Sequence, residues 1–262
     1  MGFFRYRVRC FSLQSKQVVR PMISVVVPVY NEAENLAALL TEITAAAKDA
    51  PIAEIVYVND ASTDNTEAAL VALKKDFPLL RVVSHGVQAG QSAAMWTGVR
   101  AAKSDVVVFL DGDGQNDPAD IKLLYAAYTA AGNDNGLVMV AGQREKRQDN
   151  WLRRVSSRLA NNIRAAALKD GTRDTGCSLK LVPRDVYLRL PFFNHMHRYI
   201  PALFKREGVT VIHVDVSHRP RQKGVSKYGF WDRLRAGLTD LLGVMWLNTR
   251  GRPQGFSDKE VL

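Results

Sequence analysis

The stretch "DVVVFLDGDGQNDP" (Asp105–Pro118) is decisive for the fold, because an apolar run stops abruptly at an acid. The run 106–110 has apolar residues at successive positions, which is typical of a strand buried on both faces. Asp111, Asp113 and Gln115 follow at two-residue spacing. Parallel α/β sheets bind ligands at the carboxyl ends of their strands. The stretch therefore predicts a buried strand that presents oxygen ligands at a sheet edge, although an acidic surface turn is the alternative.

The same order of elements recurs on both sides of this stretch. Strand-like runs alternate with helical patterns, and the expected strands cover residues 23–30, 54–58, 80–84, 105–110, 136–142 and 209–220. Helices are expected to begin near Asn31, Ser62 or Thr63, Ser92 and Pro118. A further strand and helix are expected within 173–190, and a helix within 195–208. This β-α order predicts a mostly parallel sheet with helices on both faces.

Two helix starts carry specific capping predictions. Asn31 with Glu34 three residues later has the spacing of a capping box. The second helix has Ser62 or Thr63 as its expected cap. The first helix should bury one face, which consists of Leu36, Leu39, Leu40, Ile43 and Ala47.

Composition restricts the classes of protein that this chain can be. The 262 residues carry a formal net charge of +10, which favours nucleic acid, anionic membrane or phosphorylated small molecules as partners. Cys10 and Cys177 form no disulfide framework or CxxC metal pattern, so a reducing, cytosolic setting is expected. No apolar stretch reaches the roughly 18–20 residues of a membrane span. None of the five histidines is predicted to bind a metal, because no partner stands at metal-ligand spacing.

The chain divides into four predicted segments. Residues 1–21 are a basic tail, either without fixed structure or acting as a membrane-touching arm. Residues 22–229 form the catalytic domain, residues 230–250 an amphipathic helix and residues 251–262 a C-terminal tail.

Four motifs together resemble a known family. They are "VVVPVYNEAENL" (25–36), "VYVNDASTDNT" (56–66), "FLDGDGQNDP" (109–118) and "KGVSKYG" (223–229). They are similar to the family 2 glycosyltransferases of the GT-A fold, and within them to the dolichyl-phosphate mannosyltransferase group. The resemblance spans about residues 23–247. Asn59 departs from it, since the family often has a first Asp there, whereas Asp60 is kept.

The resemblance implies a nucleotide-sugar site. The nucleobase and ribose would be contacted by Pro28, Tyr30, Glu32, Val58 and Asp60. Mg²⁺ or Mn²⁺ would be held by Asp111, Asp113 and Gln115, with Gly112 beside the donor. The phosphates would be met by Arg144 and, from a mobile loop, by Arg221 and Lys227. Taken from the residues alone, Tyr30 is equally a buried core residue and Glu32 equally a helix-terminal acid.

The resemblance also implies a lipid acceptor, a polyprenyl monophosphate. A phosphate monoester is already ionised near neutral pH, its second pKa being about 6. Attack on the donor therefore needs no strong base, and it would invert the anomeric centre. Arg154 and Arg158 are candidates to hold the acceptor phosphate, or else they form a solvated helix face. Asp174 could orient the acceptor, bind sugar hydroxyls, or simply pair with Arg173 or another arginine.

A polyprenyl chain stays in the bilayer, so the enzyme must reach a membrane surface. The C-terminal helix offers Trp231, Leu234, Leu238, Leu241, Leu242, Met245 and Trp246, with Arg233 and Arg235 nearby. This composition suits an interfacial helix, although the helix could instead pack on the domain or on a membrane-protein partner. The expected location is the cytoplasmic face of the membrane, in cell-envelope glycan biosynthesis.

Three other functions compete with this interpretation. A family 2 enzyme acting on a sugar hydroxyl would need a carboxylate base, for which Asp174 is the candidate. A non-catalytic nucleic-acid-binding protein would not require acids at strand ends, and no nucleic-acid-binding motif is present, so no nucleic-acid partner is expected. A dinucleotide oxidoreductase lacks its G-x-G-x-x-G motif here. The sugar, the choice of GDP or UDP, and the oligomeric state stay open.

Overall fold

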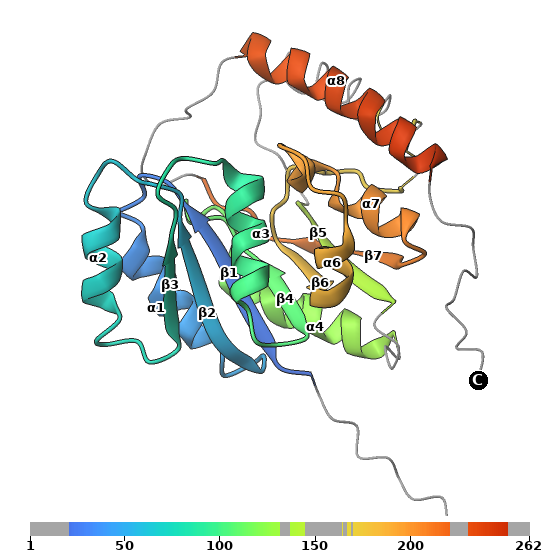
Figure 1. Cartoon of the computed structure of the whole chain (residues 1–262). Helices are drawn as coiled ribbons and strands as arrows, with labels where there is room; N and C mark the ends of the chain where they lie inside the picture. The colour runs from blue at the N-terminus through green and yellow to red at the C-terminus, as the bar shows by residue number, and fades with distance from the viewer. Residues whose placement is uncertain are drawn as a thin grey trace, which may run out of the picture.

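The computed structural model describes residues 21–131, 137–144, 164, 167–168, 170–220 and 230–250 (Figure 1). Its strands are β1 (Ile23–Val29), β2 (Ile52–Asn59), β3 (Leu80–Ser84), β4 (Val106–Phe109), β5 (Val138–Arg144), β6 (Lys180–Pro183) and β7 (Thr210–Val216). Its helices are α1 (Leu36–Ala46), α2 (Thr66–Leu73), α3 (Gln91–Ala101), α4 (Ile121–Ala130), α6 (Arg184–Arg189), α7 (Ile200–Arg206) and α8 (Phe230–Thr249). Two 3₁₀ turns, η1 (Pro118–Asp120) and η2 (Met196–Arg198), precede α4 and α7.

The seven strands form one sheet in the order β3-β2-β1-β4-β6-β5-β7. All neighbouring pairs are parallel except those of β6, which runs antiparallel to both β4 and β5. The predicted α/β fold with a mostly parallel sheet is therefore confirmed. The reversed direction of β6 has a consequence for the site, because β6 begins at the edge where β4 ends. Lys180, its first residue, lies opposite Phe109, the last residue of β4.

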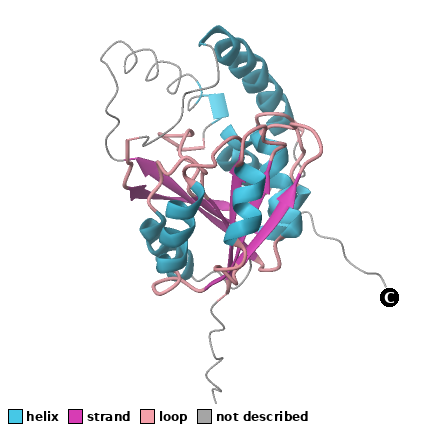
Figure 2. Cartoon of the chain, turned by 90° about the vertical axis from the view of Figure 1, so that its left-hand side faces the viewer, coloured by secondary structure: helices cyan, strands magenta, loops and turns pink. Residues whose placement is uncertain are grey.

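Helices cover both faces of the sheet (Figures 1 and 2). The α1 and α4 side buries Leu40, Ile43 and Leu124 in one apolar core. The opposite side buries Met95 of α3 and Phe204 of α7 in a second core. Strands with apolar residues on both faces are what a sheet between two such cores requires.

Both capping predictions are wrong. Helix α1 begins at Leu36, and Asn35 at its N-cap makes no side-chain capping bond. Asn31 instead adopts a left-handed backbone conformation with φ 54°. Its backbone N–H donates to Ser62 Oγ at 2.9 Å, and its Oδ1 accepts from the Thr63 N–H at 2.7 Å. The residues expected to cap two helices thus bond each other, because β1 and β2 are neighbours and bring their following turns together.

Helix α8 lies across the edge at which the parallel strands end (Figure 1). Val244 is fully buried, and Leu241 and Leu247 pack against the core on the α3 side. The Tyr199 hydroxyl donates to the Gly237 carbonyl at 3.0 Å. Leu242, Met245 and Trp246 of the same helix stay exposed. One side of the predicted C-terminal helix therefore packs on the domain, and another carries exposed apolar side chains.

Candidate active site

Three neighbouring strands deliver polar residues to one edge of the sheet. Because β2, β1 and β4 are adjacent and parallel, Asp60 and Asp111 leave the sheet on either side of Tyr30. The Asp60 N–H donates to the Val29 carbonyl at 2.9 Å, and the Leu110 N–H donates to the Val26 carbonyl at 3.1 Å. The structure thus brings these three predicted residues to a common edge.

The acid-bearing turn after β4 is held tightly against β1. A Cβ atom at Gly112 would lie 2.5 Å from Val29 Cγ1 and 3.2 Å from the Pro28 carbonyl oxygen, so a side chain there would displace the turn. Gly114 has φ +72°, which a glycine adopts without strain. Asp113 Oδ1 accepts the Gln115 N–H at 3.1 Å and closes the turn. These features fix the loop that carries Asp111, Asp113 and Gln115.

Asp111 and Asp113 form an acid pair without full compensation. Asp111 Oδ1 accepts from Gln91 Nε2, on the first residue of α3, at 2.8 Å. Burial, and then the neighbouring charge of Asp113, raise the pKa of Asp111 to about 6. Two carboxylates that repel each other at a strand end are a suitable donor set for a hard divalent cation. The donor chemistry therefore fits the Mg²⁺ or Mn²⁺ that the resemblance implies.

In the described part of the chain, no three His, Cys, Asp or Glu side chains converge on one point that could hold a metal. The predicted ligands are two carboxylates and the Gln115 amide. Mg²⁺ is commonly held in this way, by one or two carboxylates together with substrate phosphates and water.

Arg144 and Asp174 form an ion pair close to Asp111. The Arg144 guanidinium, at the end of β5, donates from Nε and Nη2 to the two Asp174 oxygens at 2.5 and 2.8 Å. Burial lowers the pKa of Arg144, but the hydrogen bonds and charge of Asp174 outweigh it and leave the pKa raised. Of the roles open to Asp174, pairing with an arginine is therefore observed, and the partner is Arg144. Arg173 instead contacts Gln143 and Asp215.

Lys180 belongs to this site and was missed by the sequence interpretation. It is 2% exposed, and its ammonium donates to the Cys177 carbonyl. Burial lowers the pKa of Lys180 by more than the charges of Cys177, Asp111 and Asp174 raise it, so the pKa lies below that of a free lysine. A lysine inside the apolar run "SLKLVP" (178–183) was the available signal, since a charge in a buried strand is costly.

Two more missed residues, Asn116 and Ser178, join the acid loop to the segment before β6. The Ser178 hydroxyl donates to Asn116 Oδ1 at 2.6 Å. Asn116 is buried, so this bond ties the two loops together below the surface. The spacing between these residues, 62 positions in the chain, explains why no local pattern reveals the pair.

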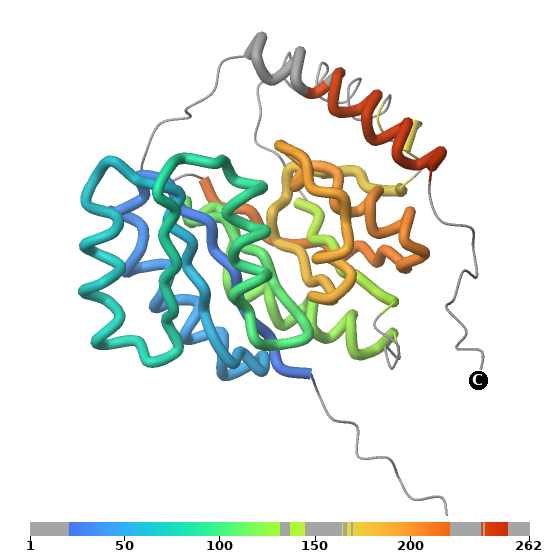
Figure 3. The backbone as a smooth tube through the Cα atoms, viewed as in Figure 1, coloured from blue at the N-terminus to red at the C-terminus, as the bar shows by residue number. Residues whose placement is uncertain are grey.

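Asp60 occupies a different kind of environment. Its Oδ1 accepts the Ala89 N–H and its Oδ2 the Gly90 N–H, each at 2.8 Å, and His85 Nδ1 lies 2.8 Å from Oδ1. The carboxylate is 4% exposed. It thereby fastens the segment between β3 and α3, which arches over the strand ends in the tube of Figure 3.

The other residues that are predicted to contact the nucleoside differ in the exposure of their side chains. Tyr30 and Pro28 are partly exposed at the edge. Glu32 accepts from Asn35 Nδ2 at 2.7 Å. The Val58 side chain, in contrast, is fully buried in the core beneath α3. A side-chain contact between Val58 and a nucleobase is therefore not possible in this structure.

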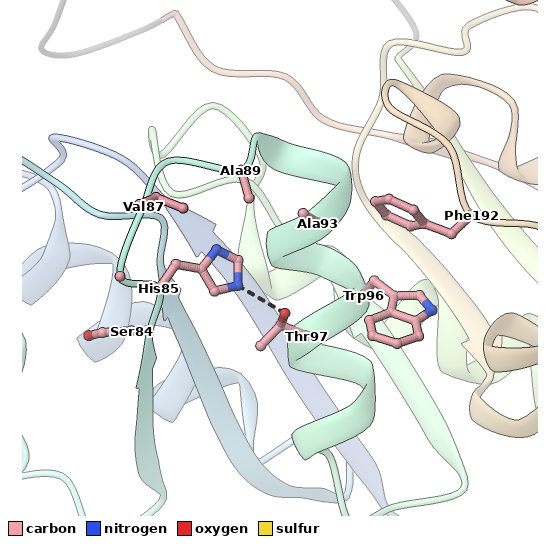
Figure 4. A pocket seen from close by; sticks show the side chains of 9 residues that line it. Ser84, His85, Val87, Ala89, Ala93, Trp96, Thr97 and Phe192 are labelled. Carbon is pink, nitrogen blue, oxygen red and sulfur yellow. Dashed lines mark hydrogen bonds between the residues drawn. The ribbon is translucent and has the colours of Figure 1, made fainter.

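A pocket of about 630 Å³ opens beside the Asp60 network, on the outer side of α3 (Figure 4). His85 lines it and also bonds Asp60, and His85 Nε2 lies 2.9 Å from Thr97 Oγ1. Trp96 and Phe192 form its apolar part, with ring centroids 6.1 Å apart. The pocket therefore adjoins the predicted nucleoside end and does not contain the acid pair.

Four predicted residues, Arg154, Arg158, Arg221 and Lys227, lie outside the described residues, as do the two tails at 1–20 and 251–262. Within the described helices, none has both the length and the apolar character needed to cross a bilayer.

Comparison with known proteins identifies the family. The model of glycosyl transferase family 2 matches residues 24–190. Dodecaprenyl-phosphate galacturonate synthase of Rhizobium johnstonii is 33% identical over 89% of this chain and 70% of its own length. Undecaprenyl-phosphate 4-deoxy-4-formamido-L-arabinose transferase of Aeromonas hydrophila is 34% identical over 79% of this chain and 63% of its own length. The chain thus spans about two thirds of the length of these relatives.

A solved structure supports the fold independently. Glucosyl-3-phosphoglycerate synthase of Mycobacterium tuberculosis superposes with a TM-score of 0.66 at 20% identity, over 90% of this chain and 82% of the other. At this identity the likeness concerns the fold alone. Together with the match to the family model and the acid motif at the end of β4, these findings show that the chain belongs to family 2 of the glycosyltransferases.

Proposed function

We propose that this glycosyltransferase moves a sugar from a nucleoside-diphosphate sugar to a polyprenyl phosphate, with inversion and with a divalent cation bound. The observation that carries the proposal is the incompletely compensated acid pair Asp111–Asp113 after β4, with the Arg144–Asp174 ion pair close to it. The names of the relatives support this acceptor class, since each joins a polyprenyl phosphate to a sugar in the name of a synthase or a transferase.

The cation would be Mg²⁺ or Mn²⁺, held by Asp111, Asp113 and Gln115. The Mycobacterium tuberculosis neighbour was crystallised with Mn²⁺ and uridine diphosphate, which supports the choice of ion. When bound, the cation supplies positive charge to the departing diphosphate. The proposed nucleotide is UDP or GDP, contacted by Tyr30, Glu32 and Asp60.

The residues of the chain contribute positioning and charge. Asp174 orients Arg144 by two hydrogen bonds, so the guanidinium is directed to its place before any ligand arrives. A preorganised cation beside the leaving group stabilises charge as it develops and needs no reorganisation. Arg221 and Lys227 would add to this positive charge. Arg154 and Arg158 would hold the acceptor phosphate. An ionised acceptor phosphate attacks without a general base, so positioning is the main task.

The alternative, transfer to a sugar hydroxyl, needs a carboxylate base near the acceptor. The candidate for that role, Asp174, is 7% exposed and accepts two hydrogen bonds from Arg144 and one from the Gly176 N–H at 3.1 Å. A carboxylate whose oxygens already accept three hydrogen bonds within the fold is poorly placed to take a proton from an acceptor hydroxyl. This observation favours the phosphate acceptor.

The experiment that tests the proposal uses the purified chain with Mn²⁺, radiolabelled UDP- and GDP-sugars, and a short polyprenyl phosphate. Chloroform-extractable label that is released by mild acid is expected, because the product is a lipid-linked sugar phosphate. Label found only on water-soluble acceptors would reject the lipid acceptor, and absence of label with any acceptor would reject the transfer itself.

The enzyme is further proposed to act at a membrane surface, in contact with lipid through α8. Trp246 and Leu242 are 60% and 59% exposed while Val244 on the same helix is buried, so the helix is anchored and still presents apolar side chains. Replacing Trp246 by Gln should lower partitioning onto anionic vesicles several-fold, since an interfacial aromatic is lost. Co-sedimentation measures it, and Val71→Gln on exposed α2 is the control. Equal partitioning of both variants and the wild type would exclude this surface.

A further inference from the structure

The Lys180 side chain lies in an apolar part of the molecule, where burying a charge costs free energy. Its cross-strand partners, Phe109 of β4 and Ala141 of β5, both belong to the apolar core on the α3 side. Its neighbours along β6, Leu179 and Leu181, point to the opposite core. Period-2 alternation therefore directs Lys180 into the α3-side core, where a leucine or methionine would cost less free energy.

The charged groups that act on the Lys180 ammonium belong to the acid site. The groups whose charge acts on Lys180 are Cys177, Asp111 and Asp174. Burial raises the pKa of the Cys177 thiol, which therefore carries no charge, and Asp174 is already paired with Arg144. His197, in η2, is partly buried, and its Nδ1 is 2.8 Å from Ser92 Oγ. Burial, and then the charges of Arg198, Lys180 and His195, lower the pKa of His197 to about 3, so this imidazole is neutral. The remaining counter-charge of Lys180 is therefore Asp111.

The tether of the ammonium fixes its place. It donates to the Cys177 carbonyl, in the segment that Ser178 links to the acid loop through Asn116. An ammonium has three donors and no acceptor, and it cannot move far from this carbonyl while the side chain is buried. The charge thus stays at the start of β6, beside the end of β4 that Asp111 follows, whether or not a ligand is present.

The charges of the site can be counted from these contacts. With every group in its ionised form, three carboxylates, Asp111, Asp113 and Asp174, stand against the two cations Arg144 and Lys180. One net negative charge remains, so a divalent cation would turn the site positive and ready for a diphosphate. Without Lys180 the same site would carry two net negative charges, which would attract a metal ion more strongly and a diphosphate less strongly.

We propose that Lys180 is a positioning residue that sets the charge of the metal and diphosphate site, weakening metal affinity in order to strengthen the binding of the nucleoside diphosphate. The inference rests on the proposed function, because it assumes that both ligands bind at Asp111 and Asp113. It differs from a structural role for Lys180 in one measurable way. Loss of the charge changes the two affinities in opposite directions, whereas loss of structure weakens both.

The experiment compares the wild type with Lys180→Met, Lys180→Gln and Lys180→Arg in the full chain. Mn²⁺ binding without nucleotide is measured by the electron paramagnetic resonance signal of free Mn²⁺. Binding of UDP and GDP at saturating Mn²⁺ is measured by calorimetry. Gln keeps a donor for the Cys177 carbonyl but removes the charge, and Arg keeps the charge. The control is Lys122→Met, because Lys122 is half exposed and lies 3.8 Å from Asp49, away from the site.

Both neutral variants should bind Mn²⁺ about tenfold more tightly and nucleoside diphosphate about tenfold more weakly, which is the size of effect that one partly screened charge produces. Lys180→Arg and Lys122→Met should match the wild type. Parallel weakening of both ligands, unchanged affinities, or failure of both neutral variants to fold would each overturn the inference. A wild-type chain that binds neither Mn²⁺ nor nucleotide would instead refute the proposed function, so the two failures are distinguishable.

Discussion

Asp60 and Asp111 end two strands of the same sheet, yet the structure treats their carboxylates in opposite ways. Asp60 receives two backbone N–H groups and lies against His85, all at 2.8 Å. Asp111 accepts a hydrogen bond from Gln91 and is favoured by Ser178, Lys180 and Arg144, but burial and then the like charge of Asp113 outweigh these groups and raise its pKa to about 6. One acid is satisfied by the fold, and the other is left for an external cation.

The difference separates two uses of an acidic side chain at a sheet edge. A carboxylate surrounded by donors stabilises the loop that supplies them. A carboxylate held beside another carboxylate costs the ligand-free protein free energy, which a bound cation can recover. Perturbed acids of the second kind mark functional sites more often than acids of the first kind. Asp60 thus contributes first to the shape of the site, and Asp111 to its chemistry.

The largest effect is expected for Asp113→Ala, which removes one member of the acid pair. Sugar transfer should fall by about a thousandfold or more, because charge stabilisation of the leaving group is lost. Metal-dependent nucleotide binding should disappear with it. Calorimetry with UDP and GDP plus Mn²⁺ and the lipid-labelling assay measure both losses. Asp76→Asn, at an exposed position after α2, should change neither, and an unchanged rate in Asp113→Ala would remove the acid pair from the mechanism.

An intermediate effect is expected for Asp60→Ala, and it concerns stability. The Ala89 and Gly90 N–H groups lose their acceptor, and leaving buried donors unsatisfied costs about 1–3 kcal/mol each. The free energy of unfolding should fall by about 3 kcal/mol in urea denaturation, with Asp76→Asn as the reference. If stability were unchanged and only nucleotide affinity fell, Asp60 would act on the ligand and not on the loop, and the contrast with Asp111 would be lost.

The smallest effect is expected for Asp111→Asn in the absence of metal, and it is a gain in stability. The folded-state pKa of about 6 lies above the usual value of about 3.9, so the unfolded chain loses this proton first as the pH rises. Stability from this group is therefore fully present below about pH 4 and is lost as the pH passes about 6. Asp111→Asn should stabilise the protein by about 1–2 kcal/mol at pH 7.5 in EDTA, and hardly at pH 4.

Urea denaturation at the two pH values measures this difference. Added Mn²⁺ should stabilise the wild type and have little effect on the Asn variant, because the amide has no charge to offer. Destabilisation by Asp111→Asn in EDTA at pH 7.5 would show that the carboxylate is satisfied within the fold, as Asp60 is.

Much of the fold could be read from local pattern. The strand predicted over 80–84 coincides with β3, and the apolar run before Asp111 contains β4. Such runs are informative because a strand buried on both faces must be apolar throughout. The capping predictions failed for a physical reason. Polar residues after β1 and β2 had acceptors and donors in each other's turn, and these outcompeted the helix ends.

The candidate site could be predicted only where its residues stand together in the chain. The acid motif is such a case, since strand end and ligands are contiguous. The partner of Asp174 was left open because its alternatives differ only in space, and Arg144, thirty residues away, proved to be the one in contact. Lys180 was overlooked for the same reason, because its sequence neighbours give no sign that an acid lies nearby.

The sequence by itself determined the β-α order, the acid motif after a buried strand and the family. Each of these depends on neighbours in the chain, through the period of apolar residues and through motif spacing. Only the tertiary structure decided which acid is satisfied and which is not, and that β6 runs antiparallel to β4, so that Lys180 lies beside the strand end that Asp111 follows. The energy of a charge depends on every donor and charge within a few ångströms, and folding brings these from distant parts of the chain.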